Sequence, residues 1–328
     1  MEIKVVTNQA EWDGWLKNQS QCSFTQSWSW GEILISEEKK IERLQFIEGG
    51  KVCGAGQFIF NEALGFEYFF CPKGPIVKAG FVEVFTALEK YFKQKGISFL
   101  RFEPCCKNGI EDKSVYKKTI DINPRATTIL ELKQTEQELL EKMHSKTRYN
   151  VRLAEKKNIL ISEDKNFEFF WQLINETRKR DGFRLHDKRH YEEILKSPSV
   201  KQLTAMLDGK PIAVLVLISF GDTTTYLFGA SDYEHRHLMA PYLLQWRAIK
   251  IAKIASSSFY DFFGIAPHKI GFSGTDYEYD ENHQYAGVTR FKLGFGGTIS
   301  EQPGTFDLVV SEGKYKVYEV LRKVRRIL

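Results

Sequence analysis

Hydrophobic and polar positions follow the same order of patterns in two parts of the chain, residues 50–102 and 209–265. Each part opens with a Gly-Lys pair and two runs rich in β-branched and aromatic residues, which predict a β-hairpin and a further strand. A proline-containing loop follows, and then a helical pattern, over 81–96 in the first part and over 242–255 in the second. A last apolar strand ends each part. This duplicated order predicts an α/β (α+β) protein of two similar domains, each a mixed sheet flanked by helices.

Helical signals also mark the join between the two parts, near residues 130–160. A capping box that starts at Thr135 (Thr-Glu-Gln-Glu) predicts the start of one helix. Ser145 is placed to cap a second helix over 146–158. On this second helix, Tyr149 and Leu153 lie on a face that we expect to pack inward.

The last sixteen residues, 313–328, combine an apolar stripe at helical spacing with basic residues elsewhere. The stripe consists of Val317, Leu321, Val324 and Leu328. This pattern predicts an amphipathic helix that docks on the body of the protein through the stripe. We therefore expect one domain of residues 1–145 together with the helix 313–328, and a second domain of residues 146–312.

Composition places the chain among ordinary globular proteins. Of its 328 residues, 42% are hydrophobic and 27% charged, which excludes disorder or a coiled coil as the main state. Five cysteines without a CxxC pair fit a reducing compartment better than a disulfide framework. The first residues are polar, unlike a signal peptide, and the longest apolar run, Ile212 to Phe220, is too short to cross a bilayer. We expect a soluble, cytoplasmic protein with no stable membrane insertion.

Charge is distributed unevenly, although the net charge is only +5. Residues 142–157 carry six cations and one acid, and the last sixteen residues carry the same numbers. On the helix expected over 146–158, three basic residues recur at every fourth position and share a face: Arg148, Arg152 and Lys156. Two basic patches indicate a polyanionic partner, and two solvated helix faces are the equally weighted alternative.

Most short catalytic motifs are absent from the sequence. It contains no GxxxxGK[ST], no strand-linked GxGxxG, no GxSxG and no HExxH. His186 and His190 have the spacing of metal ligands on a helix, but Lys188 and Arg189 beside them would repel a cation. No metal site is therefore expected.

The segment GVTRFKLGFGG (287–297) has a more specific chemistry. Its four glycines allow a ligand or another backbone to approach closely. Lys292, held between them, is suited to stabilise a phosphate or a developing oxyanion. A β-bulge leading into a strand with core aromatic residues is the alternative of equal weight.

Nine segments, in order along nearly the whole chain, resemble motifs of the Fem family of peptidoglycan-bridge aminoacyltransferases (FemABX). The specific ones are LLEKMHSKTRYNVRLAEKKNI (139–159) and GVTRFKLGFGG. The others are FTQSWSWGE (24–32), CPKGPIV (71–77), LRFEP (100–104), RDGF (180–183), TTYLFGAS (224–231), APYLLQWRAIKIAK (240–253) and YDFFGI (260–265). Because the chain has no long charged helical insertion, it resembles the compact members that lack a helical arm.

The resemblance implies two acetyltransferase (GNAT-like) domains, with the C-terminal helix on the first. It implies transfer of an amino acid (glycine, alanine or serine) from aminoacyl-tRNA to the stem-peptide amine of a peptidoglycan precursor, which builds the interpeptide bridge. The acceptor would be UDP-MurNAc-pentapeptide or lipid II. Because the tRNA ester is already activated, the reaction needs no cofactor, metal or covalent intermediate. We expect a monomer in the cytoplasm or at the inner face of the membrane.

The resemblance also implies roles for individual residues. Lys292 and Phe291 match the family position near the tRNA 3′ end, where Lys292 would neutralise developing charge and Phe291 would stack on a base. Glu103 and Asp261 are the candidates for the base that accepts the proton of the amine. The acceptor-binding candidates are Tyr226, Arg184, Lys188 and Arg189, and the tRNA-binding candidates are Arg148, Arg152 and Lys156.

Two positions depart from the family pattern. Many relatives have a lysine three residues after Trp30-Gly31, suited to a pyrophosphate, and this chain has Leu34 there. Relatives also tend to have acid-Pro-acid where this chain reads Glu103-Pro104-Cys105. We therefore expect the acceptor to be bound differently near Leu34.

Two other functions stay open at this stage. A GNAT-fold acyl-CoA-dependent N-acyltransferase would bind the CoA pyrophosphate through a Gly-rich loop, but the corresponding loops, 72–80 and 231–241, lack paired glycines. A non-catalytic RNA-binding protein would use the two basic helices and would tolerate the loss of Lys292. A pocket with Lys292 at its floor would favour an enzyme.

Overall fold

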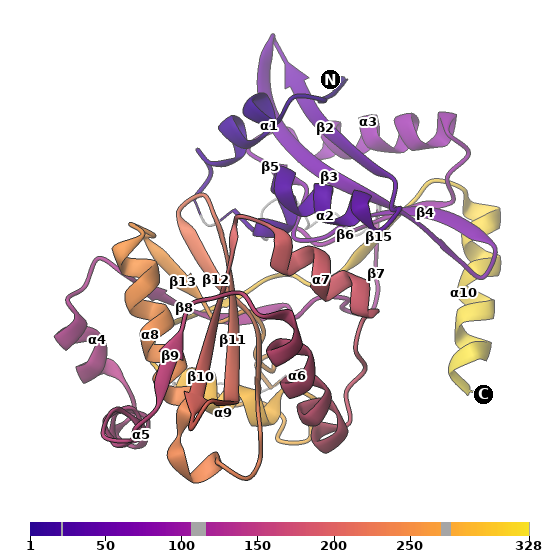
Figure 1. Cartoon of the computed structure of the whole chain (residues 1–328). Helices are drawn as coiled ribbons and strands as arrows, with labels where there is room; N and C mark the ends of the chain where they lie inside the picture. Colours follow the sequence, from indigo (N-terminus) through magenta and orange to yellow (C-terminus); the bar gives the residue numbers. More distant parts are fainter. Residues whose placement is uncertain (21, 106–115, 270–276, 328) are drawn as a thin grey trace. The chain divides into compact units, whose positions relative to one another are not determined.

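The computed structural model describes residues 1–20, 22–105, 116–269 and 277–327. The chain divides into two compact units (Figure 1). Unit 1 comprises Met1–Asn18, Thr25–Arg125 and Gln302–Leu328, and unit 2 comprises Gln19–Phe24 and Ala126–Glu301. Each unit contains one mixed β-sheet flanked by helices, which confirms the predicted fold class.

Unit 1 is built on a sheet with the strand order β1-β2-β3-β4-β6-β15-β7, and β5 pairs with β3. Its strands are β1 (Glu2–Val5), β2 (Ile41–Glu48), β3 (Lys51–Ala63), β4 (Phe66–Cys71), β5 (Ile76–Val77), β6 (Phe99–Phe102), β7 (Tyr116–Lys118) and β15 (Phe306–Val309). Its helices are α1 (Gln9–Leu16), α2 (Trp28–Ser36), α3 (Phe81–Gln94) and α10 (Glu312–Ile327). Strands β4 and β6 pair in parallel because α3 crosses over between them.

Unit 2 is built on a sheet with the strand order β14-β8-β13-β12-β11-β10-β9. Its strands are β8 (Ala126–Glu131), β9 (Leu160–Ser162), β10 (Val200–Leu207), β11 (Lys210–Phe220), β12 (Thr223–Ser231), β13 (Phe259–Asp261) and β14 (Thr298–Glu301). Its α-helices are α4 (Glu136–Lys142), α5 (Ser145–Glu155), α6 (Phe167–Asp181), α7 (Lys188–Lys196), α8 (Ala240–Ile254) and α9 (Ala286–Leu293). A short 3₁₀ turn covers Arg236–Leu238, and another covers Phe24–Gln26, where the chain passes from unit 2 to unit 1. The parallel pair here is β12 with β13, which α8 connects.

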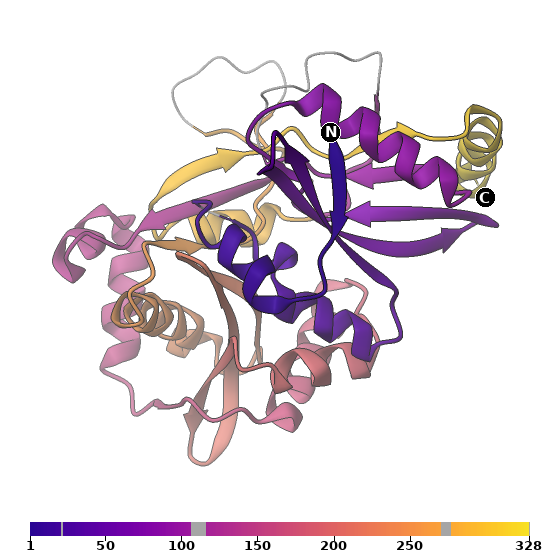
Figure 2. The same cartoon turned by 90° about the horizontal axis from the view of Figure 1, so that it is seen from above.

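The duplicated order predicted from the sequence is present in both units. A hairpin (β2-β3 or β10-β11), a strand (β4 or β12), a helix (α3 or α8) and a parallel strand (β6 or β13) follow one another in each. Helix α3 buries one stripe, Val84, Phe85, Leu88 and Phe92, against one face of its sheet (Figure 2). Helix α3 was recognisable by its amphipathic period. Helix α8 is buried on most of its surface, so its signal was a long, mainly apolar segment.

Each sheet also contains a strand from a distant part of the sequence. In unit 1, β15 lies between β6 and β7, and in unit 2, β8 lies between β13 and β14. The units therefore divide after Arg125 and after Glu301, whereas we expected boundaries after 145 and 312. The difference arises because β8, α4 and α5 contribute Leu130, Leu139, Met143 and Val151 to the core of unit 2.

The C-terminal helix α10 packs on unit 1, but through a different face from the predicted one. Tyr315 and Tyr318 are buried against Phe99, whereas Val317, Leu321 and Val324 are exposed. Leu328, the last member of the predicted stripe, lies outside the described residues. The two tyrosines bury larger side chains than the valines, and their hydroxyls reach a buried ion pair.

That ion pair joins Arg101 on β6 to Asp307 on β15. The guanidinium donates to both carboxylate oxygens of Asp307 at 2.7 and 2.8 Å, and both side chains are buried. The Tyr315 hydroxyl donates to the same carboxylate at 2.9 Å. Burial opposes the charge of Arg101, but the hydrogen bonds and charge of Asp307 outweigh it and raise the pKa of the guanidinium, which stays charged. Burial, together with Asp307, raises the pKa of Tyr315, which stays protonated.

Among the described residues, no helix is both long enough and apolar enough to span a membrane.

Candidate active site

Lys292 lies in unit 2 on helix α9, with 8% of its surface exposed. The segment is helical, so the β-bulge that the sequence left open is not formed there, although β14 does follow as the expected strand. The Nζ atom donates hydrogen bonds to the carbonyl oxygens of Phe263 and Gly264, both at 2.7 Å. These two bonds hold a buried amine at a fixed point.

The two carbonyl oxygens belong to a tight turn that follows strand β13. Phe263 and Gly264 have φ values of 47° and 90°, a region that favours glycine. Asp261 holds the turn, because its Oδ1 accepts hydrogen bonds from the backbone N–H of Phe263 at 2.8 Å and from the hydroxyl of Thr127. Asp261, a candidate base from the sequence, thus positions the acceptors of Lys292.

Burial lowers the pKa of Lys292 to about 7, and the negative charge of Asp261 partly opposes this decrease. A neutral amine still has two N–H groups, which is enough for both carbonyl oxygens. The third position on Nζ is then a lone pair in the neutral form and an N–H in the charged form. Near neutral pH, Lys292 is therefore suited both to accept and to donate a proton at that position.

Tyr226 lies beside Lys292 on strand β12, and the Nζ of Lys292 is 5.4 Å from the centre of its ring. A β-bulge interrupts the pairing of β11 with β12 at this point, a feature common next to active sites. The Tyr226 hydroxyl makes no hydrogen bond to a described residue, and burial raises its pKa to about 12. It is therefore a neutral donor available to a ligand. A Cβ atom at Gly229 would overlap this hydroxyl, which explains the glycine.

Phe291 precedes Lys292 on α9 and is half-buried. Its ring packs edge-to-face against Tyr242 and Phe295, with centroid distances of 5.0 and 5.3 Å. These contacts attach α9 to the core of unit 2. Stacking of Phe291 on a tRNA base stays a prediction.

The glycines after Lys292 allow backbone segments of unit 2 to approach each other. A Cβ atom at Gly294 would overlap the hydroxyl of Thr147 on α5, and one at Gly297 would lie 2.7 Å from the carbonyl oxygen of Ile129. The carbonyl oxygen of Gly294 accepts the backbone N–H of His144 at 2.9 Å. The two segments that carry the specific resemblance are thus in direct contact. The sequence left two uses open for these glycines, the close approach of a ligand or of another backbone segment. In the structure they allow another backbone segment to approach closely.

Replacing Gly294 with alanine is expected to destabilise unit 2 by about 1–3 kcal/mol, because the added methyl group overlaps Thr147. The backbone of Gly294 has φ −58°, which alanine adopts without strain, so the overlap alone is tested. The measurement is urea unfolding of the variant. Gly287→Ala, on the same helix with open space around the glycine, is the matched control.

The Gly294→Ala substitution should be less destabilising in a Thr147→Ala background. Equal destabilisation in the two backgrounds would contradict the proposed overlap.

The three basic residues predicted to share a face of α5 do not share a role. The Nη1 atom of Arg148 donates to the carbonyl oxygens of Leu140, Glu141 and Met143 at 3.0–3.1 Å. Arg148 thus satisfies the free carbonyl groups at the end of α4. Arg152 and Lys156 are exposed and have no ion pair with described residues.

Two further expectations about α5 were wrong. Its N-cap is His144, whose Nδ1 accepts the N–H of Lys146, and Ser145 is the first helical residue. Tyr149, expected to pack inward, is 65% exposed. The buried face is instead formed by Thr147, Val151 and Ala154.

Glu103 belongs to unit 1 and is fully engaged in hydrogen bonds. Its Oε1 accepts from the backbone N–H of Asn123 at 2.8 Å and from the hydroxyl of Thr305 at 3.1 Å. Its Oε2 accepts from the side-chain amide of Asn123 at 2.8 Å and from the N–H of Lys73 at 3.2 Å. The carboxylate ties three loops together, which explains its burial without a catalytic role.

The remaining acceptor-binding candidates are exposed on α7 and the loop before it. Lys188 pairs with Glu168 and Glu192 at 4.0 and 3.8 Å. Arg184 has no ionic partner in the described parts of the chain, and Arg189 is also exposed. Among the described residues, the amine of Lys292 contacts Phe263, Gly264 and the Tyr226 ring, and none of these three cations. Leu34, which replaces the lysine of many relatives, is buried on α2.

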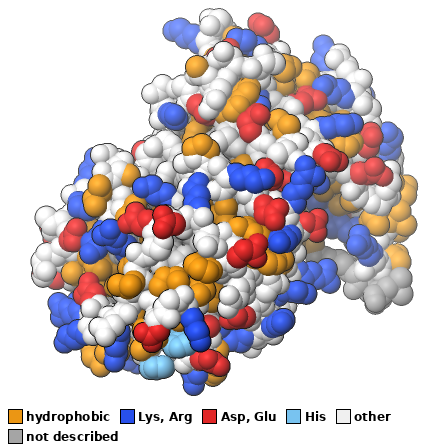
Figure 3. Space-filling model, viewed as in Figure 1, with side chains coloured by type: hydrophobic (Ala, Val, Ile, Leu, Met, Phe, Trp, Pro, Cys, Tyr) orange, Lys and Arg blue, Asp and Glu red, His pale blue; other side chains and the backbone are white. Residues whose placement is uncertain are grey.

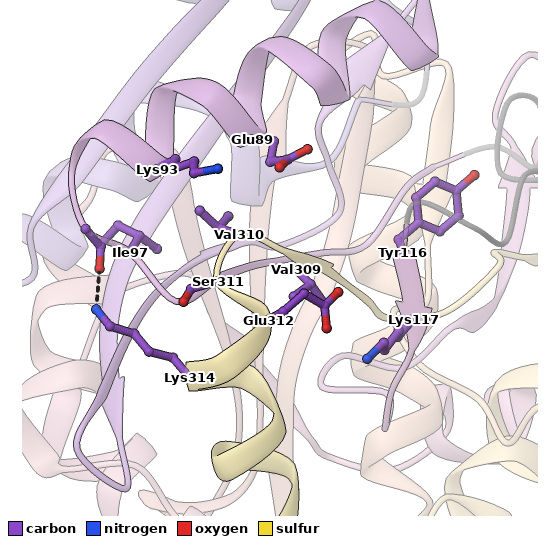
Figure 4. Close-up of a pocket in the computed structure, with 11 residues that line it drawn as sticks. Glu89, Lys93, Ile97, Tyr116, Lys117, Val309, Val310, Ser311, Glu312 and Lys314 are labelled. Atoms are coloured by element: carbon purple, nitrogen blue, oxygen red, sulfur yellow. Dashed lines mark hydrogen bonds between the residues drawn. The ribbon is translucent and has the colours of Figure 1, made fainter.

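A cavity of about 730 Å³ lies elsewhere, beside the start of α10 in unit 1 (Figure 4). Three lysines, Lys93, Lys117 and Lys314, line it together with two glutamates, Glu89 and Glu312, so its lining carries charges of both signs. None of the site residues predicted from the sequence lines this cavity. In the described parts of the chain, no group of three or more His, Cys, Asp or Glu residues is arranged to hold a metal.

The FemAB family model matches residues 7–119, 115–207 and 199–323. The chain belongs to the FemAB family. This confirms the resemblance seen in the sequence.

Relatives of this FemAB protein include lipid II:glycine glycyltransferases of Staphylococcus epidermidis, 23% identical over 415 aligned positions, and of Staphylococcus aureus, 22% identical over 416. Each alignment covers 98% of this chain and 96% of the relative. Because the alignments are longer than the 328 residues of this chain, the relatives contain insertions that it lacks. This agrees with the compact form of the family.

Solved structures similar to this FemAB protein include FemX, with a TM-score of 0.81, 18% identity and coverage of 97% of this chain and 99% of that chain. The C-terminal domain of a putative lysylphosphatidylglycerol synthetase from Agrobacterium fabrum gives a TM-score of 0.60 at 11% identity, over 96% of each chain. A tandem GNAT protein from the clavulanic acid pathway gives 0.51 at 10% identity, over 94% of this chain and 99% of that chain. These likenesses confirm the GNAT-like fold.

Proposed function

We propose that this FemAB protein is an aminoacyltransferase that moves an amino acid from aminoacyl-tRNA to the stem-peptide amine of a peptidoglycan precursor. The relatives act, by their names, on lipid II and transfer glycine, so lipid II and glycine are the acceptor and donor that we propose first. The observation that carries the proposal is the buried amine of Lys292, whose pKa of about 7 suits the proton transfer that amide formation from an ester requires.

The reaction follows from this amine. The nitrogen of the acceptor forms a bond to the ester carbonyl carbon and becomes positively charged, while the carbonyl oxygen becomes an oxyanion. Neutral Lys292 accepts one proton from that nitrogen at the third position of Nζ. The resulting ammonium stabilises the oxyanion, which is the role expected from the sequence. When the C–O bond breaks, Lys292 returns the proton to the leaving ribose oxygen, so charge and protons balance.

Other residues of unit 2 position this amine and its substrate. Asp261 and Thr127 fix the turn that holds Lys292, so they are positioning residues in this proposal. The Tyr226 hydroxyl is the donor that we assign to a polar group of a substrate. Because the oxygens of Glu103 already accept four hydrogen bonds, we do not assign it the base.

The donor tRNA is proposed to bind the exposed cations of α5. Replacing both Arg152 and Lys156 with glutamine should weaken tRNA binding and reduce the slope of log Kd against log salt by about 2, because about two phosphate contacts are lost. Fluorescence anisotropy with labelled aminoacyl-tRNA at several salt concentrations measures both quantities. Lys201→Gln/Lys210→Gln, two exposed lysines of the β10–β11 hairpin, is the matched control. An unchanged salt slope would refute this assignment.

The experiment that tests the proposed function uses a mixture of charged tRNAs with lipid II or UDP-MurNAc-pentapeptide, followed by mass spectrometry of the precursor. The expected result is a gain of one amino-acid residue, which identifies donor and acceptor together. An additional reaction with acetyl-CoA tests for an ordinary GNAT activity. No gain on either precursor, with tRNA binding intact, would overturn the proposal.

A further inference from the structure

The outer face of helix α10 carries an apolar stripe that nothing in unit 1 covers. Val317, Val320, Leu321 and Val324 follow the i, i+3, i+4, i+7 spacing of one helix face. Their exposed fractions lie between 41% for Leu321 and 59% for Val320. In the space-filling view, apolar side chains reach the surface at α10 with basic side chains beside them (Figure 3).

This stripe is not needed to attach the helix. Tyr315 and Tyr318 anchor α10 on the opposite side, against Phe99 and the Arg101–Asp307 pair. Arg322 adds a hydrogen bond to the hydroxyl of Thr119. Because the helix is already held, its second apolar face is available to another surface.

Basic residues flank the stripe on both sides. At 100° per residue, Lys316 and Lys323 lie along one edge of the stripe, and Lys314 and Arg325 lie along the other. All four are exposed, and none forms an ion pair with the described residues. Lys314 instead donates to the carbonyl oxygen of Gly96 at 3.0 Å. A strip of aliphatic side chains with cations along both edges is complementary to a bilayer interface, where acyl chains lie below anionic headgroups.

We propose that α10 is a peripheral membrane-binding helix that lies in the plane of an anionic bilayer surface and places the stripe at the headgroup boundary. An RNA partner would contact the cations but would leave the aliphatic side chains unused, since bases stack on aromatic rings or arginine. The charge complementarity therefore favours a lipid surface. The inference rests on α10 alone and does not depend on the proposed aminoacyl transfer.

The test is cosedimentation of the full chain with vesicles of phosphatidylcholine alone or of equal parts phosphatidylcholine and phosphatidylglycerol. Binding is expected to the mixed vesicles and not to the neutral ones. The Val320→Ser/Leu321→Gln variant should bind the mixed vesicles about tenfold more weakly or worse, because two apolar side chains are lost from the interface. The Lys316→Gln/Lys323→Gln variant should bind roughly thirtyfold more weakly, because each lysine near an anionic surface contributes about 1 kcal/mol.

The matched control is Leu160→Gln/Ile254→Gln, which removes two apolar side chains that are exposed elsewhere, on β9 and α8. It should bind like the original protein. All the substituted positions are exposed, so thermal unfolding should be unchanged, and this is verified for each variant.

Three outcomes would overturn the proposal. One is the absence of binding to the mixed vesicles. Another is loss of vesicle binding only in the lysine variant, with parallel loss of tRNA binding, which would indicate a nucleic-acid surface. The third is concentration-dependent self-association in sedimentation that the Val320→Ser/Leu321→Gln variant abolishes, which would indicate that a second copy covers the stripe. None of these readouts requires the transferase activity, so a failure here is distinguishable from a failure of the proposed function.

Discussion

Replacing Lys292 with methionine is expected to lower kcat/KM for amino-acid transfer by about 10²–10³-fold, with little change in KM for the tRNA. Methionine keeps the length of the side chain within the buried site but removes the amine that we propose accepts and returns the proton. The two carbonyl oxygens of Phe263 and Gly264 lose their donor, so thermal unfolding must be measured in parallel. Arg290→Ala, an exposed cation on the same helix, should retain full activity.

The pH dependence of the same reaction identifies the role of the amine. Burial lowers the pKa of Lys292 to about 7, so its neutral, proton-accepting form grows as pH rises through 7. The kcat/KM of the original protein should therefore rise across this range and level off above it. The inflection should be absent in the Lys292→Met variant. A rate that falls as pH rises through 7 would show that the charged form is required from the start and would refute proton acceptance.

Replacing Asp307 with alanine is expected to destabilise unit 1 by about 3–5 kcal/mol, because it leaves the buried guanidinium of Arg101 without its partner. The same change removes the acceptor of the Tyr315 hydroxyl and so weakens the attachment of α10. Urea unfolding followed by tryptophan fluorescence measures the effect, since Trp12, Trp15, Trp28 and Trp30 all lie in unit 1.

Two comparisons separate the buried pair from an ordinary surface contact. Glu11→Ala breaks the exposed Lys4–Glu11 pair and should change stability by less than about 1 kcal/mol. The Arg101→Met/Asp307→Leu double variant should be more stable than Asp307→Ala, because it leaves no unpaired charge in the core. If Asp307→Ala proved as mild as Glu11→Ala, the Arg101 charge would not depend on this partner.

Much of the fold was predictable because the same order of strand and helix patterns occurs twice in the sequence. The helices α3 and α8 and the strands around them follow local patterns of apolar residues, which need no knowledge of long-range contacts. The unit boundaries were not predictable in this way. Nothing in the local pattern of 126–131 or 306–309 indicates that these strands insert into the middle of a sheet.

The candidate site shows the same division between local and long-range information. Lys292 was predicted from its glycine-rich surroundings and the family resemblance. Tyr226, predicted separately as an acceptor-binding residue, lies next to it, which the sequence did not predict. Thr127 was missed because its contact with Asp261 joins residues far apart in the chain. The turn at Phe263 and Gly264 carried a usable signal, a glycine three residues after the end of a short strand. For α10, the predicted stripe contained aliphatic residues alone, whereas the face that packs on unit 1 contains Tyr315 and Tyr318.

The position of β15 bears on how the chain folds as it leaves the ribosome. All the strands of unit 2 are made by residue 301, whereas the sheet of unit 1 lacks the strand between β6 and β7 until residues 306–309 have emerged. Domains generally fold in the order of synthesis, from the N-terminus onward. We expect the opposite order here, because unit 2 has its last strand by residue 301, whereas the sheet of unit 1 keeps an open edge at β6 until β15 has been made.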